Sequence, residues 1–323
     1  MPRYSTATLF DSLRARSIGA HRRIADGKRW GVEQSEDTIT ETLLLSLRRA
    51  FPYLKVRHFT RYGESKTGAD WEWWWRGSDR WFHVLVQAKR LIRLRRGVLG
   101  YRFDYKVGEE RIPQYELLLR AATTRLAAPI YVLYNGPDLI MPSSWPCGVL
   151  PKRRDVMGAS FLAGEAAAGR ARLAALEQSS IRGLDWPLPC IVCPFTRSRC
   201  GLPMQFWTRT REWQSAFMGS LGFPSGTGAN DLALLASLAY TRSIISLRLQ
   251  QFRALGDAES RAAAIGSYVA RAVKPDAPPY VDRILQSTPD DQPEISSEDL
   301  GPYPPQRVVV VTEASRSNQR GGF

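Results

Sequence analysis

The side chains best suited to chemistry lie within residues 64–89. The order ESKTGADWEWWWRGSDRWFHVLVQAK places Asp70 near the start of one apolar segment, and Gln87 and Lys89 near the end of the next. Both segments are rich in aromatic and branched residues, which favours strands, and residues 77–79 supply turn chemistry. We therefore predict a hairpin that brings a carboxylate, an amide oxygen and an ammonium group to one end. Such a set of groups suits a site for a divalent cation and a phosphate.

Alternation along each strand decides which of these groups share a face. If residues 70–75 are extended, Asp70 and Glu72 point to one side and the tryptophans at 71, 73 and 75 to the other. On the second strand, one face carries His83, Leu85, Gln87 and Lys89. Glu72 is therefore a further acid on the face of Asp70, one pleat away. We expect the tryptophans to pack in the core and at the sheet edge rather than to stack on bases.

The elements around the hairpin follow a regular order. A helix capped by Ser35 or Asp37 is predicted to run to about Ala50. The other predicted elements are a strand at residues 53–60, a helix at 112–126 and a buried strand at 129–135. The order is thus helix, three strands, helix, strand.

These residues and this order resemble the PD-(D/E)XK nuclease superfamily. Asp70 is followed on the next strand by Gln87-Ala88-Lys89, and this Gln-x-Lys form, with Gly68-Ala69 upstream, is most similar to the Mrr-like restriction-endonuclease branch. The likeness covers roughly residues 37–135, less than half of the chain. It implies an α/β fold with a restriction-endonuclease-like αβββαβ core, followed here by a mainly α-helical C-terminal extension.

The resemblance also implies a role for each site residue. Asp70 would be the principal metal carboxylate, Gln87 a neutral carbonyl ligand where most relatives have Asp or Glu, and Glu41 a ligand from the first helix. Lys89 would stabilise charge on the phosphate or help to orient the attacking water. Mg²⁺ or Mn²⁺ would polarise the phosphodiester and lower the pKa of a bound water. The implied activity is that of a metal-dependent nuclease acting on DNA, in bacterial defence or DNA processing.

Alternatives to these roles stay open. Glu33, Glu36 and Glu64 compete with Glu41 for the helical ligand. Because Gln87 removes one negative charge, the alternative function is a catalytically inactive nuclease fold that binds nucleic acid. Outside such a fold, an acid and a lysine on neighbouring strands would form an ordinary cross-strand ion pair.

The charge of the chain points to a polyanionic partner. Its 323 residues carry a formal net charge of +14 with a sequence pI near 10.0. Such a charge could simply be a solvated basic surface, but next to a predicted phosphate site it favours binding to nucleic acid. The basic residues nearest the predicted lysine, expected to bind nucleic acid, are Arg90, Arg93, Arg95 and Arg96. We expect DNA rather than RNA as the partner, and a homodimer stays open.

No apolar run is long enough for a membrane span, and charged residues interrupt the N-terminus where a signal peptide needs an apolar segment. We therefore expect a cytoplasmic protein with no membrane partner. Cys190, Cys193 and Cys200 have the spacing of a zinc knuckle, with Cys147 as a distant fourth ligand. They suit a buried strand at residues 187–195 as well, and buried thiols are preferred over structural Zn²⁺.

Four regions are expected along the chain. Residues 1–36 form a basic N-terminal arm, 37–136 the nuclease core, 137–312 the mainly helical extension packed on the core, and 313–323 a disordered tail. Within the extension the predicted elements are helices at 158–178, 205–221, 230–255 and 260–273, and a late strand at 308–312 that returns to an earlier sheet.

Overall fold

The computed structural model describes residues 6–51, 53–58, 68–94, 97–107, 111–143, 145, 147–172, 177–193, 218–224, 227, 231–253, 266–288, 295 and 307–312. Expected features at residues 205–217, at 260–265 and in the tail after residue 312 lie outside these ranges. So do Glu64, Arg95, Arg96 and Cys200.

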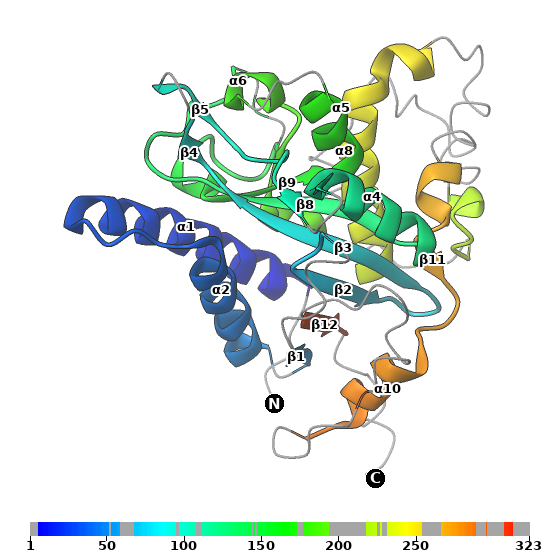
Figure 1. The fold of residues 1–323 in the computed structure, drawn as a ribbon. Helices are drawn as coiled ribbons and strands as arrows, with labels where there is room; N and C mark the ends of the chain where they lie inside the picture. The colour runs from blue at the N-terminus through cyan, green and yellow to red at the C-terminus, as the bar shows by residue number, and fades with distance from the viewer. Residues whose placement is uncertain are drawn as a thin grey trace.

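A mixed sheet occupies the centre of the described structure (Figure 1). Its strands follow the order β1 (Leu54–His58), β12 (Arg307–Val311), β2 (Trp71–Arg76), β3 (Trp81–Arg90), β8 (Ala128–Tyr134), β9 (Ala159–Ala163) and β10 (Trp186–Pro187), and β11 (Val273–Lys274) also pairs with β3. Strands β2 and β3 are antiparallel, whereas β3 and β8 are parallel. β2, β3, β8 and β9 are buried along almost their whole length, so the sheet is covered on both faces. The fold belongs to the mixed α/β class.

The predicted hairpin is confirmed. Trp71 pairs with Val86 and Trp74 with His83 in the antiparallel register of β2 and β3. The tryptophans are confirmed as core residues: Trp71, Trp73 and Trp75 are fully buried and pack edge to face along one side of β2. Trp74 lies on the other side, where it stacks on His83. The two faces of the hairpin thus divide as strand alternation requires.

The helices flanking the hairpin begin where capping chemistry places them. α2 (Glu36–Ala50) starts after Ser35, whose hydroxyl accepts a hydrogen bond from the backbone N–H of Thr38. α4 (Gln114–Thr124) follows Pro113. α4 and α8 (Leu232–Arg253) cover opposite faces of the sheet, because Arg125 at the end of α4 bonds Glu72 while Tyr240 of α8 packs on Phe82 (Figure 1).

The basic N-terminal segment, expected as an arm, is a long helix against the core. α1 (Thr6–Trp30) buries one stripe that includes Leu9, Phe10 and Leu13. It packs on two 3₁₀ turns, η3 (Asp155–Met157) and η4 (Leu188–Val192). Its exposed face carries the basic residues, so charge and packing occupy different sides of one helix.

The C-terminal half supplies strands as well as helices. The late strand is confirmed as β12, which lies between β1 and β2, antiparallel to the first and parallel to the second. The described residues of the expected helical extension also contribute β9, β10 and β11. Two local predictions were wrong: the helix expected from residue 158 begins only at Gly164, as α5 (Gly164–Arg172), because β9 precedes it, and residues 188–192 form η4 rather than a strand.

The smaller described elements are α6 (Gln178–Ile181), α10 (Pro279–Gln286), β4 (Ile92–Arg93), β5 (Leu99–Gly100), β6 (Lys106–Val107) and β7 (Ile112–Pro113). α10 packs beside β12 and β1, where Tyr280 and Ile284 join Trp74, Val308 and Val310 in a second apolar cluster. The return of the chain to the sheet therefore closes the face opposite the main core.

Candidate functional site

The carboxylate of Asp70 is fixed against the end of β3. Its Oδ2 atom accepts hydrogen bonds from the backbone N–H of Ala88 at 2.7 Å and from Nε2 of Gln87 at 2.9 Å. The backbone N–H of Asp70 donates to the carbonyl of Val86 at 2.8 Å, which extends the hairpin ladder by one residue beyond β2. The side chains of Asp70 and Gln87, predicted to meet, therefore do meet.

A glycine two residues earlier sets the approach of the chain to Asp70. Gly68 has φ +63°, and a Cβ at this position would lie 2.7 Å from the carbonyl oxygen of Gln114 at the start of α4. A side chain is excluded both by the left-handed backbone and by this close contact. The first turn of α4 can thus pack directly on the segment that leads into Asp70.

Gln87 is buried with half of its amide unsatisfied. Its Nε2 atom donates to Asp70 and, at 3.3 Å, to the carbonyl of Ala88. Its Oε1 atom is buried and has no hydrogen-bond partner among the described residues. An unpaired buried carbonyl of this kind costs about 1–3 kcal/mol. This oxygen is available to accept a hydrogen bond or to bind a cation.

Lys89 ends beside a carboxylate from α2. Its Nζ atom lies 3.6 Å from Oε2 of Glu36, while Oε1 of Glu36 accepts a hydrogen bond from the backbone N–H of Arg90 at 2.8 Å. The lysine side chain is only 8% exposed and that of Glu36 is 37% exposed, so the pair lies at the boundary between core and solvent. The capping of α2 at Ser35 puts Glu36 at this point.

Glu41, the acid expected from this helix, is placed elsewhere. Its Oε1 atom accepts a hydrogen bond from Arg307 of β12 at 3.0 Å, and its side chain is 56% exposed. The buried face of α2 contains Ile39, Thr40, Leu43, Leu44 and Leu47. Glu36 lies on this face at helical spacing from Thr40 and Leu43, and Glu41 does not. The same spacing in the sequence could have selected Glu36 among the competing acids.

Two tyrosines of β8 feel the charge of Asp70, and sequence reasoning missed both. Tyr131 is the register partner of Gln87 in the pairing of β3 and β8. Burial raises the pKa of Tyr134, and the negative charges of Asp70 and Glu36 raise it further, while its hydrogen bond with Thr40 acts in the opposite direction. Burial also raises the pKa of Tyr131, with Asp70 as the next cause. Both phenols therefore stay protonated at neutral pH. Asp70, which precedes β2, and Glu36 of α2 thus both act on the pKa of Tyr134 through their charge.

Glu72 is committed to a separate buried cluster. Its carboxylate accepts hydrogen bonds from Arg125 at 2.8 Å, Tyr280 at 2.8 Å and the indole of Trp74 at 2.9 Å, and lies 2.5 Å from Nε2 of His83. Burial opposes ionisation, but Arg125 and His83 outweigh it and hold the pKa of Glu72 well below its usual range. Glu72 therefore ties α4 and α10 to the sheet rather than adding charge near Asp70.

The two described arginines after Lys89 differ in burial and in their partners. Arg90 is half-buried: its guanidinium donates to the carbonyl of Gln34 at 2.8 Å and pairs with Glu33. Arg93 is exposed on β4. The first of these arginines therefore fixes the α1–α2 connection to β3, and the second faces solvent.

Within the described ranges, no three His, Cys, Asp or Glu side chains gather as a metal-binding group. Cys147, Cys190 and Cys193 are buried in the core. None of the helices in the described part of the chain is both long and apolar enough to span a bilayer.

The fold and this polar cluster define a mixed α/β protein with a buried carboxylate–amide–lysine set at one end of its central hairpin. The chain belongs to the family described as "Family of unknown function (DUF6615)", whose model matches residues 9–317. No curated protein and no solved structure gives a significant match.

Proposed function

We propose that this protein is a metal-dependent nuclease of the PD-(D/E)XK type that hydrolyses phosphodiester bonds of nucleic acid, DNA rather than RNA. The observation that carries the proposal is that the Asp70 carboxylate accepts hydrogen bonds from Ala88 and Gln87. Two residues after Gln87, Lys89 lies beside a second carboxylate, that of Glu36. The order α2, β1, β2, β3, α4, β8, with the two-residue strands β4 to β7 between β3 and α4, supports it, since this is the order on which the resemblance rests.

The residues present fit a hard divalent cation. Oε1 of Gln87 is a buried oxygen without a partner among the described residues, and Asp70 supplies a carboxylate beside it. Asp70 and Gln87 would hold Mg²⁺ or Mn²⁺, with Glu36 in place of the expected Glu41. The ion would supply Lewis-acid polarisation of the phosphodiester and an activated water.

The other groups act on the phosphate through their charge. Lys89 carries its ammonium group in a largely buried position, where electrostatic interactions are stronger than in water. It would stabilise negative charge that builds on the phosphoryl oxygens. Glu36 holds this ammonium group near β3 and, through the N–H of Arg90, is itself held by the strand.

Plasmid cleavage tests the proposal. Supercoiled DNA is incubated with the wild-type chain and with Asp70→Asn and Lys89→Gln, each with Mg²⁺ or Mn²⁺ and with EDTA. We expect cleavage that needs the ion and is about 10²–10³-fold slower in both variants. Asp79→Asn is the matched control, because Asp79 is exposed in the turn of the same hairpin. Metal-dependent cleavage at equal rates in wild type and Asp70→Asn would reject the assigned site.

A catalytically inactive nucleic-acid-binding protein is the second candidate. The neutral Gln87 favours it, because the site then has one charge fewer to attract a cation. In that case no ion supports cleavage, while DNA binding persists and weakens steeply with salt. A gel-shift titration from low to moderate salt measures this, and a flat response excludes a phosphate-binding role.

A further inference from the structure

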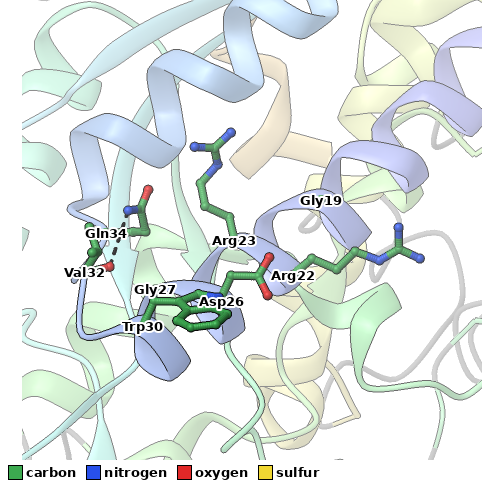
Figure 2. A pocket seen from close by; sticks show the side chains of 8 residues that line it. All are labelled: Gly19, Arg22, Arg23, Asp26, Gly27, Trp30, Val32 and Gln34. Carbon is green, nitrogen blue, oxygen red and sulfur yellow. Dashed lines mark hydrogen bonds between the residues drawn. The ribbon is translucent and has the colours of Figure 1, made fainter.

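A hollow lies where α1 ends and the chain turns toward α2 (Figure 2). Its lining residues are Gly19, Arg22, Arg23, Asp26, Gly27, Trp30, Val32 and Gln34. α1 ends with Gly31 at φ +68°, and the N–H of Val32 bonds the carbonyl of Gly27 at 2.8 Å. This is the Schellman arrangement, in which an apolar side chain at position 32 normally packs on one at position 27 or 26. Here those positions hold glycine and aspartate, so Val32 has no apolar partner there.

The consequence is an unusual amount of exposed apolar surface. Trp30 is 70% exposed and Val32 is 61% exposed, although both lie close to the buried core of α1. The Cζ atom of Arg29 lies 5.0 Å from the centroid of the Trp30 ring, a cation–π contact. An exposed indole beside arginines can stack on a planar ligand that also carries negative charge.

The charges around the indole select the kind of ligand. Arg22 and Arg23 are exposed on the preceding turns of α1, and neither forms an ion pair within the part of the chain that the structure describes. Figure 2 shows their side chains pointing in different directions, and the acidic Asp26 lines the same hollow. Arg23 and Trp30 are seven residues apart, so they share a helix face about 10 Å apart along the axis. An exposed aromatic ring near such cations suits the bases and phosphates of a single strand.

The hollow is also fixed beside the candidate catalytic residues. Gln34 lines it, and the carbonyl of Gln34 accepts a hydrogen bond from Arg90, whose own N–H bonds Glu36. Trp30 precedes Glu36 by six residues, so their Cα atoms lie no more than about 20 Å apart. A strand bound at the hollow could therefore continue to Lys89 within a few nucleotides.

We propose that this hollow binds an unpaired segment of the nucleic acid, with a base stacked on Trp30 and phosphates contacted by Arg22 and Arg23. The hollow would then select single-stranded or flapped substrate, because bases inside a duplex do not offer their faces to a side chain. The inference rests on the proposed nuclease function for the identity of the ligand.

Binding without cleavage tests the inference. A fluorescein-labelled oligo(dT) of 12 nucleotides and a duplex of the same length are titrated in EDTA with the full chain, and anisotropy is recorded. We expect Trp30→Ala to weaken single-strand binding about 5- to 100-fold and duplex binding less than twofold, while Trp30→Phe stays within about threefold of wild type. Leu45→Ala, which removes an apolar side chain of α2 that is also more than half exposed, is the control.

Salt dependence gives a second readout, which a merely structural role would not change. In Arg22→Gln/Arg23→Gln the slope of log Kd against log salt should fall by about 1.4 for the single strand. The inference is overturned if Trp30→Ala binds the single strand within twofold of wild type. It is also overturned if the arginine variant keeps the wild-type slope of log Kd against log salt. Asp70→Asn should keep wild-type binding and lose cleavage, so the two proposals can fail separately. If Trp30→Ala loses single-strand binding but the wild-type protein does not cleave DNA, only the nuclease proposal is rejected.

Discussion

The backbone N–H of Ala88 donates a 2.7 Å hydrogen bond to the carboxylate of Asp70, so the acid that precedes β2 is attached to the main chain of β3. The donor lies between Gln87 and Lys89. Because the attachment point is backbone, the position of the carboxylate depends on the register of the hairpin and not on the identity of residue 88.

Gln87→Glu should make the stability of the protein depend on divalent cations. Two buried carboxylates would face each other without the Nε2 donor, so the free energy of unfolding in EDTA should fall by about 1–3 kcal/mol. Mg²⁺ should recover this loss, because it binds the folded state preferentially. Thermal unfolding with EDTA and with a series of Mg²⁺ concentrations measures both effects. Equal melting temperatures under the two conditions would argue against a cation site at Asp70 and residue 87.

Glu36 and Glu41 should separate in their effects on cleavage. Glu36→Gln removes the negative charge beside Lys89 and should slow plasmid cleavage about 10- to 100-fold. Glu41→Gln breaks a pair that is more than half exposed on the acid side, so it should leave the rate within twofold and cost at most about 1 kcal/mol of stability. Each variant is the control for the other. If Glu41→Gln slowed cleavage more than Glu36→Gln did, Glu41 and not Glu36 would be the acid of the site.

Gly68→Ala should displace Asp70. The new Cβ would meet the carbonyl of Gln114 at 2.7 Å in a backbone conformation that L residues rarely adopt. We expect a loss of about 1–3 kcal/mol in the free energy of unfolding, together with slower cleavage. Gly169→Ala is the matched control, because a Cβ there meets no atom within 4 Å and residue 169 lies in α5. Unchanged stability and rate in Gly68→Ala would show that this contact does not position the carboxylate.

His83 should make the protein less stable in mild acid. The pKa of His83 is lowered to about 4, chiefly by burial; Glu72 acts in the opposite direction, and Lys274 and Arg125 contribute to the lowering. Between its usual value near 6.5 and about 4, the unfolded chain binds a proton that the folded chain does not. The contribution of His83 is therefore fully present above pH 6.5 and is lost as the pH falls toward 4.

Replacement of His83 by Phe, which retains a ring over Trp74, removes this titration. The slope of unfolding free energy against pH between 5 and 6.5 should then be smaller than that of wild type by about 1 kcal/mol per pH unit. Urea unfolding at several pH values measures the slopes. Glu72, whose pKa is also lowered, adds a loss only below about pH 4.5, its ordinary value, in both proteins. Parallel slopes would mean that His83 is protonated in the folded state.

Local sequence rules determined the central elements of this protein. Alternation separated Trp71, Trp73 and Trp75 from Asp70, and Ser35 marked the start of α2, because both depend only on residues a few positions apart. The convergence of Asp70 and Gln87 followed from the same alternation once two adjacent strands were expected. The valine run at 308–311 was recognisable as a strand for the same reason.

Partners from distant parts of the chain decided the rest. Arg307, 266 residues after Glu41, binds that acid, and Tyr280 and Arg125 bind Glu72. Residues 159–163 form a strand rather than a helix because β8 and β10 pair with them. Strand pairing and buried ion pairs gain their free energy from groups brought together by the whole fold, so no short window of sequence contains the information. The sequence therefore determined which groups could form a site, and the tertiary structure decided that Glu36, rather than Glu41, lies beside Lys89.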